Sequence, residues 1–263
     1  MSLVDLESVE VNSSTIKVLY LNNPATKNSL TWEMGEEFFY TIEGLKNTNP
    51  YPRALIITGS NDIFSSGGDL TLLKSFTNKS YEENARDMVK FYNFFLSIRT
   101  LPFPVIGAIN GHAIGAAFSM ALACDVRVFS LESRYSFNFV KIGIHPGMGS
   151  TYFVKELFGT HAAVSLLLMA ESLTGREALE KGICHDAVLS EEVLKRAMEY
   201  AINLSEDSPM ALRMLKKNLY DNEKLQEMLK REAEAQAKNF TSQDFLESLA
   251  AMEQKRKPIF RDK

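Results

Sequence analysis

Apolar residues recur in two patterns along the first half of the chain. Segments 3–11 and 15–21 alternate apolar and polar residues, which is typical of two paired strands around a turn at Asn12, Ser13 and Ser14. The short apolar segments 53–59 and 105–109 indicate buried strands. Apolar residues at helical spacing predict helices over 31–46 and 80–99. The alternation of strands and helices predicts an α/β fold.

The pattern changes after about residue 151, where the chain becomes almost wholly amphipathic and helical. We predict helices over 151–157, 162–170, 191–204, 209–220 and 222–238. Each of these segments has one apolar face, and such faces must be buried against another surface.

A glycine-rich turn follows each of the two buried strands. The first turn reads FSSGGDL at residues 64–70, and the second reads NGHAIGAA at residues 110–117, where an apolar helix begins. A helix start presents unpaired N–H groups, which suit an oxygen that becomes anionic during a reaction. One such loop alone is more often a packing turn. Two consecutive loops can direct two N–H groups at one oxygen, as an oxyanion hole requires.

The composition of the chain argues against some classes of binding partner. The 263 residues are 45% hydrophobic and 24% charged, enough to bury a full core, and the net charge of −4 gives no reason to expect nucleic acid or an anionic membrane surface as a partner. The first residues do not resemble a signal peptide, and no apolar run is long enough for a membrane span. We therefore expect a cytoplasmic protein.

The cysteines and histidines indicate neither a disulfide nor a metal site. Cys124 lies in an apolar helix and Cys184 beside Gly182 and Ile183, so we expect two buried free thiols. Four scattered histidines and two cysteines show no metal-ligand spacing, and we expect no metal.

Several motifs occur in an order that resembles the crotonase, or enoyl-CoA hydratase/isomerase, superfamily. Beside the two glycine loops these are LNNPATKNSL (21–30), ACDVR (123–127), GIHPGMGST (143–151) and EQKRKPIF (253–260). The resemblance runs nearly end to end. It implies a spiral of repeated ββα units with a C-terminal helical extension, divided into a core over 1–200 and a trimerisation region over 201–263. A homotrimer or dimer of trimers is then expected. The implied substrate is a thioester of CoA or acyl carrier protein, with CoA as part of the substrate and no separate cofactor.

The resemblance also assigns roles to individual residues. The N–H groups of Ser66 and Ala116 would form the oxyanion hole for the thioester carbonyl. Asp69 is expected to cap the helix after the first loop instead of acting as a base. The residues implied in substrate binding are Ala25, Thr26, Lys27, Gly67, Gly68, Asp69, Leu70, Gly115, Phe139, Lys257 and Phe260.

The acid/base positions depart from the family's pattern. The two hydratase glutamates align with Ser119 and Phe139, and a third acid of some isomerases aligns with Gly147. Simple hydration is therefore not expected. Decarboxylation of a carboxyacyl thioester needs the oxyanion hole but no base, because cleavage of the C–C bond itself delivers electrons to the enolate. The segment 138–151 resembles the decarboxylating crotonases of polyketide β-branching.

Those decarboxylases suggest Lys79 as a catalytic residue, but their C-terminal histidine aligns with Gln236. Among the remaining groups, His145 is the best titratable candidate, although a loop histidine that faces solvent is the commoner case. Ser119 could orient a water molecule or a polar substrate group. Isomerisation and an atypical hydration stay open as reactions. The competing class is a non-catalytic acyl-thioester binding protein on the same scaffold.

Overall fold

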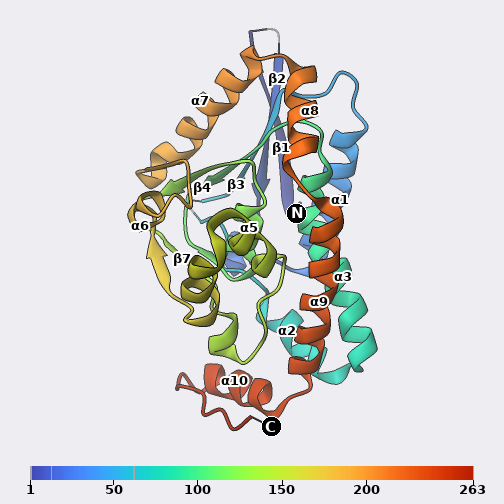
Figure 1. Cartoon of the computed structure of the whole chain (residues 1–263), viewed down its shortest axis with the longest axis vertical. Coiled ribbons are helices and arrows are strands. Elements are labelled where there is room, and N and C mark those ends of the chain that lie inside the picture. The colour runs from blue at the N-terminus through green and yellow to red at the C-terminus, as the bar shows by residue number, and fades with distance from the viewer. Residues whose placement is uncertain (1, 13, 62, 263) are drawn as a thin grey trace.

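A six-stranded sheet runs through the protein in the order β1-β2-β3-β4-β6-β9 (Figure 1). The computed structural model describes residues 2–12, 14–61 and 63–262. The strands of this sheet are β1 (Val4–Val11), β2 (Ser14–Leu21), β3 (Ala54–Gly59), β4 (Val105–Ile109), β6 (Val126–Ser130) and β9 (Asp186–Val188). β1 and β2 form the predicted antiparallel pair, and all the other pairs in this sheet are parallel. The predicted turn at 12–14 includes Ser13, which lies outside the described residues.

A second, three-stranded sheet has the order β5-β7-β8. Its strands are short: β5 (Ala113–Ile114), β7 (Arg134–Ser136) and β8 (Ser172–Thr174). β5 follows β4 and leads into α4 (Ala116–Leu122), so this part of the chain is a ββα unit of the kind predicted. The expectation of an almost wholly helical chain after residue 151 is wrong for β8 and β9, because three-residue strands leave no recognisable period in the sequence.

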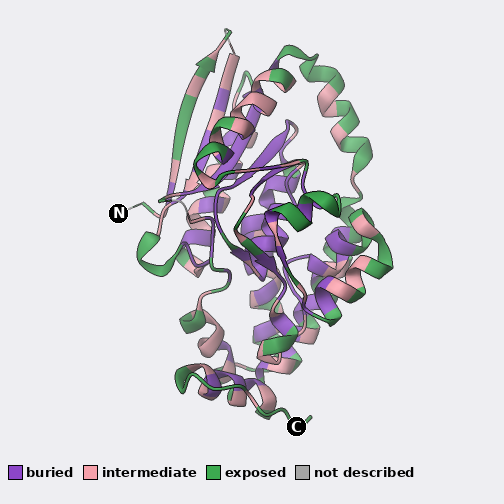
Figure 2. Ribbon diagram, turned by 90° about the vertical axis from the view of Figure 1, so that its left-hand side faces the viewer, coloured by how far each residue is buried: buried purple, intermediate pink, exposed green. Residues whose placement is uncertain are grey.

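Helices cover both faces of the large sheet. On one face, α7 (Val193–Glu206) places Val193, Ala197 and Ala201 against Ile56 and Ile106 of the strands. The opposite face packs against α1 (Trp32–Lys46), α3 (Tyr81–Leu96) and the central helix α4. Figure 2 shows the central strands as almost wholly buried. This burial on both faces explains why β3 and β4 read as continuous apolar runs.

The remaining helices surround the second sheet and the lower part of the molecule, except for the helix after α7, which lies beside β2 in the upper part (Figure 1). They are α2 (Leu70–Ser75), α5 (Ser150–Ala163), α6 (Gly175–Glu180), α8 (Pro209–Leu219), α9 (Asn222–Phe240) and α10 (Gln243–Glu253). Short 3₁₀ turns lie at Pro24–Thr26, Phe76–Asn78, Ser97–Thr100, Phe139–Ile142 and Ser190–Glu192, and a π-helical turn lies at Val164–Leu168. Ser80 and Glu83 form a capping box that starts α3 one residue into the predicted range.

The C-terminal helices pack on their own chain. α9 lies along α3, and the two are neighbours in Figure 1. α10 was not among the predicted helices; it begins after Ser242, whose side chain accepts a hydrogen bond from the Phe245 N–H. The role of residues 201–263 in a trimer stays a prediction.

Two further predictions, on the cysteines and on membrane spans, can be compared with the structure directly. Cys124 and Cys184 are both buried and free, as expected. Over the described ranges, no helix has the length and apolar character needed to cross a membrane.

Candidate active site

The two glycine loops leave the same edge of the large sheet. β3 and β4 are adjacent and parallel, so the loops that follow them begin side by side. The Ser65 N–H donates to the His112 carbonyl at 3.1 Å, and Ser65 pairs with Ala113 in an isolated parallel bridge. The two loops are therefore in direct contact, which the expected joint action on one oxygen requires.

Gly67 allows this close approach. Its φ is +92°, a conformation that side chains disfavour, and a Cβ atom at this position would lie 2.3 Å from the Ile114 carbonyl oxygen. Gly115 has a φ of +56° and immediately precedes α4. Both residues are therefore required as glycines by the backbone.

Of the loop N–H groups without an acceptor among the described residues, two belong to residues that line one cavity, and one of these two differs from the prediction. The Ser66 N–H donates to the Lys27 carbonyl at 3.0 Å, so it is not a free donor and the prediction for Ser66 is wrong. Gly68, two residues later, and Ala116, the first residue of α4, donate their N–H groups to no acceptor among the described residues. Nothing in the sequence indicates that residue 27 returns to the loop and takes up the Ser66 N–H.

Both free N–H groups belong to residues that line one small cavity of about 90 Å³. Its walls are mostly apolar and include Leu73, Met88, Phe91, Phe139, Ile142 and Met148. Its polar side chains come from Ser66, Tyr92, Asn138 and Gln236. No carboxylate, imidazole or ammonium group is among the described residues that line it.

Tyr92 and Gln236 form a buried pair in the wall of this cavity. Each is 2% exposed, and the Tyr92 hydroxyl donates to Gln236 Oε1 at 2.7 Å. Gln236 Nε2 donates to the His145 carbonyl at 2.7 Å, which fixes the orientation of the amide. Burial raises the pKa of the Tyr92 phenol well above its ordinary value, with a further contribution from the nearby Glu232. The phenol is therefore neutral at physiological pH.

The three positions without carboxylates are filled in different ways. Ser119 is fully buried, and its hydroxyl lies 3.3 Å from the Gly147 carbonyl, which it donates to; Ser119 does not line the cavity. The Phe139 ring forms part of the wall. A Cβ atom on Gly147 would lie 2.4 Å from Tyr92 Oη and 2.6 Å from Gln236 Nε2. Tyr92 and Gln236 therefore occupy the space that a side chain at position 147 would need.

The structure gives no support to the catalytic roles predicted for Lys79 and His145. Lys79 Nζ pairs with Asp87 at 2.9 Å and lies over the Phe76 ring, outside the cavity lining. His145 lines a different, mainly apolar cavity of about 610 Å³. Its Nδ1 lies 2.6 Å from the Pro146 carbonyl, and burial lowers its pKa.

The predicted substrate-binding residues form two groups, one beside the first glycine loop and one on the C-terminal segment. The first group comprises residues 25–27, Asp69 and Leu70. Thr26 and Lys27 belong to the segment that holds the first loop, since Ser66 bonds to both of their carbonyl oxygens. Ala25, Thr26 and Lys27 are all exposed. Leu70 is the first residue of α2. Asp69 caps α2 by accepting from the Leu72 N–H at 3.0 Å, as predicted.

Lys257 and Phe260 lie on the C-terminal segment, and both are exposed. The Phe260 ring approaches Gly143, where a Cβ atom would lie 3.3 Å from the ring. The backbone around them is held by α10, because Glu247 accepts from the Ile259 N–H and Asp244 from the Arg261 N–H. Their contact with a CoA moiety stays a prediction.

Glu232 holds a loop of the site in place through hydrogen bonds. The sequence analysis did not predict this role. This α9 residue is 1% exposed and accepts hydrogen bonds from the N–H groups of Gly149 at 2.6 Å and Thr151 at 2.8 Å. It thereby satisfies the start of α5 and holds the loop that carries Gly147 and Met148. The sequence presented Glu232 as one charge in a repetitive charged helix, with no signal of its burial.

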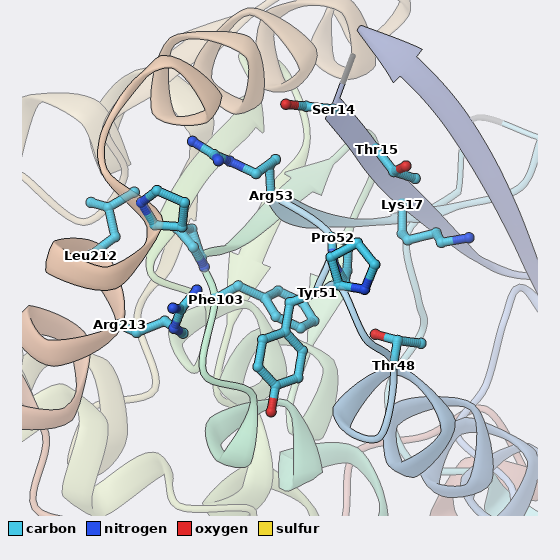
Figure 3. A pocket seen from close by; sticks show the side chains of 13 residues that line it. Ser14, Thr15, Lys17, Thr48, Tyr51, Pro52, Arg53, Phe103, Leu212 and Arg213 are labelled. Atoms are coloured by element: carbon cyan, nitrogen blue, oxygen red, sulfur yellow. The ribbon is translucent and has the colours of Figure 1, made fainter. Parts of the chain in front are cut away.

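A separate cavity of about 440 Å³ opens between β2, the segment before β3 and α8 (Figure 3). None of the glycine-loop residues lines it. Arg53, which does, donates to the carbonyl oxygens of Ser205 and Asp207 and so fastens the end of α7. The Tyr51 ring packs against Phe103. These contacts give Arg53 and Tyr51 structural roles. We therefore place the candidate site at the glycine loops.

Known proteins are similar to this chain over most of its length. The family model described as enoyl-CoA hydratase/isomerase matches residues 11–263. The bacillaene synthase decarboxylase PksI of Bacillus subtilis is 32% identical over 216 residues, which cover 81% of this chain and 83% of PksI. The short-chain-enoyl-CoA hydratase of Clostridium acetobutylicum is 28% identical over 245 residues, covering 92% of each chain.

Solved structures show the same fold. The enoyl-CoA hydratase of Bacillus halodurans superposes with a TM-score of 0.84 at 28% identity, covering 94% of this chain and 99% of that one. A structure from a dehydratase/decarboxylase enzyme couple of polyketide β-branching gives 0.81 at 28% identity, covering 94% and 98%. The predicted crotonase fold, and its resemblance to the decarboxylating members, are confirmed. The chain belongs to the enoyl-CoA hydratase/isomerase family.

Proposed function

We propose that the protein is a decarboxylase of a carboxyacyl thioester. The observation that carries this proposal is a cavity with two free N–H donors, from Gly68 and Ala116, and no carboxylate, imidazole or ammonium group among its described lining residues. Stabilising an enolate needs the first of these features. Hydration needs in addition a base that activates water, and the described lining holds no carboxylate, imidazole or ammonium group for that task.

The reaction begins with the thioester carbonyl oxygen bound between the N–H groups of Gly68 and Ala116. The bond between the α-carbon and the carboxylate breaks, CO₂ leaves, and its electron pair moves to the carbonyl oxygen as the enolate forms. The two N–H groups stabilise the negative charge on that oxygen. A proton then adds to the α-carbon and gives the product thioester.

The apolar walls of the cavity also favour decarboxylation. A carboxylate at position 119, 139 or 147 would repel an anionic substrate, and these positions hold Ser119, Phe139 and Gly147. The substrate carboxylate enters surroundings formed by Phe91, Phe139 and other apolar side chains, where its charge is poorly solvated. The neutral CO₂ that leaves has no such cost. The similarity to the decarboxylase PksI supports this reading.

The alternatives differ in what they require of the loops. A hydratase or isomerase would need a base, and the one titratable side chain of the described lining, Tyr92, is a neutral phenol. A protein that only binds thioesters has no need for two N–H groups directed at one carbonyl oxygen. Whether the thioester is carried by CoA or by an acyl carrier protein does not alter the proposed chemistry, since the reacting atoms are the same.

Gly68 offers a matched pair of variants for the test. Gly68→Pro removes the N–H that we assign to the oxyanion hole, whereas Gly68→Ala keeps it and its new Cβ meets only Leu73 Cδ1, at 4.0 Å. We expect Gly68→Pro to lower the rate of CO₂ release from a pool of carboxyacyl-CoAs by about 10²- to 10³-fold. Gly68→Ala should release CO₂ at the wild-type rate. Equal rates in the two variants would contradict the assigned role of this N–H.

A further inference from the structure

The proposed reaction leaves an enolate that must receive a proton, and the site contains one titratable side chain among its described lining residues. That residue is Tyr92. We infer that the Tyr92 hydroxyl delivers the proton to the α-carbon after CO₂ leaves. This inference rests on the proposed decarboxylation and assigns the step that the oxyanion hole cannot perform.

The geometry places the hydroxyl at the cavity wall. Met88, Phe91 and Tyr92 lie on one face of α3 and all line the cavity. The absence of a side chain on Gly147 leaves the hydroxyl its space, because a Cβ there would lie 2.4 Å from Tyr92 Oη. The hydroxyl hydrogen points to Gln236 Oε1, and rotation about the Cζ–Oη bond turns it away from that acceptor.

The proton transfer balances without a further reactant in the cavity. The Oη–H bond of Tyr92 breaks, a C–H bond forms from the enolate electron pair, and Tyr92 is left as a phenolate. The backbone of Met148 lowers the pKa of this phenol, against the effect of burial, and so stabilises the phenolate. A proton from solvent water then restores the phenol. The transfer is favourable because a thioester enolate is a far stronger base than a phenolate.

Gln236 positions the phenol for this step. Its Nε2 is held by the His145 carbonyl, so its Oε1 faces Tyr92 and fixes the ring oxygen between α3 and α9. A hydroxyl fixed on one side of the cavity protonates only one face of a planar enolate. The stereochemistry of the product therefore reports on the donor.

The test is decarboxylation of methylmalonyl-CoA in D₂O, with the configuration of the α-deuterated propionyl-CoA as the readout. We expect the wild type to give one enantiomer. Tyr92→Phe should still release CO₂ but give a racemic product, at a rate lower by about 10²-fold. Tyr152→Phe is the matched control: it removes a hydroxyl that donates to the Asp221 carbonyl and does not line the cavity. It should retain both the rate and the single enantiomer.

The outcomes separate the two proposals. A wild type that releases no CO₂ from methylmalonyl-CoA or from the pool of carboxyacyl-CoAs contradicts the decarboxylase function itself. A wild type that releases CO₂, with Tyr92→Phe giving the same single enantiomer, overturns the assignment of Tyr92 alone. If Tyr92→Phe does not fold, 3-fluorotyrosine at position 92 replaces it, since this residue keeps the ring and makes the phenol more acidic. It should change the H/D ratio incorporated from mixed H₂O and D₂O; an unchanged ratio overturns the assignment.

Discussion

The carboxyl group of Glu232, on α9, accepts a hydrogen bond from the N–H of Gly149 at 2.6 Å and so joins the C-terminal helices to a loop of the site. Burial raises the pKa of this carboxyl to about 7, although hydrogen bonds from Thr151 and Gly149 act in the opposite direction. The charged form is thus the less stable one in the folded protein below pH 7.

This shift predicts how stability depends on pH. The Glu232 pKa is raised above its unfolded value of 4.5, so the unfolded state loses the proton first as the pH rises. The contribution of Glu232 to the free energy of unfolding is full below pH 4.5 and falls by about 3 kcal/mol as the pH rises to about 7. Glu232→Gln cannot ionise and should lack this decline. Urea unfolding of both proteins between pH 4.5 and 8 measures the difference, and parallel profiles would contradict the shift.

Gly67 should tolerate no side chain. In Gly67→Ala the positive φ and the 2.3 Å approach to the Ile114 carbonyl together force the two loops apart. We expect a loss of at least 10²-fold in turnover, because displaced N–H groups no longer meet one oxygen, and about 2–4 kcal/mol of lost stability. Gly182→Ala is the control, since Gly182 has a φ of +69° with no atom within 4 Å of the added Cβ. It should lose about 1–2 kcal/mol and keep its turnover. Thermal unfolding and CO₂ release measure both effects.

Lys79 should be dispensable for the reaction. Its ammonium group is paired with Asp87, and its side chain is 35% exposed, so Lys79→Ala removes a surface ion pair. We expect less than about 1 kcal/mol of lost stability and a turnover within about twofold of the wild type. A loss of 10²-fold or more in kcat, with the fold intact by circular dichroism, would show that Lys79 enters the site when substrate is bound.

Two variants of Phe139 separate the effect of charge on kcat/KM from the effect of side-chain shape. Phe139→Glu returns a carboxylate to the cavity wall, where it opposes an anionic substrate by about 2–3 kcal/mol, on the order of 10²-fold in kcat/KM. Phe139→Gln has nearly the same shape and no charge, and should lose much less. Steady-state rates for both variants at pH 8.5 give the comparison. Equal losses would mean that the missing carboxylate does not matter to substrate binding.

The sequence predicted the parts of this structure that depend on local pattern. The β1–β2 pair, the two buried strands, the helices α1 and α3, and the cap at Asp69 all follow from short-range periodicity and capping residues. The glycine loops were located correctly for the same reason, because their turn chemistry is visible in a few consecutive residues.

What could not be predicted depends on contacts between distant segments. The Ser66 N–H is taken up by Lys27, which approaches the loop from 39 positions earlier, and this moved the free donor to Gly68. Tyr92 reads as one apolar position of α3, and Gln236 as one polar position of a charged helix. They become a pair only because α9 packs along α3.

We propose above all that the protein removes CO₂ from a carboxyacyl thioester without a base. Mass spectrometry of the wild type and Gly68→Pro, each incubated in D₂O with separate pools of carboxyacyl-CoAs and enoyl-CoAs, tests it most directly. We predict a product that has lost CO₂ and gained one deuterium, formed by the wild type alone and from the carboxyacyl pool alone. Addition of water to the enoyl pool, or a shifted double bond, with no loss of CO₂ from the carboxyacyl pool, would contradict the claim.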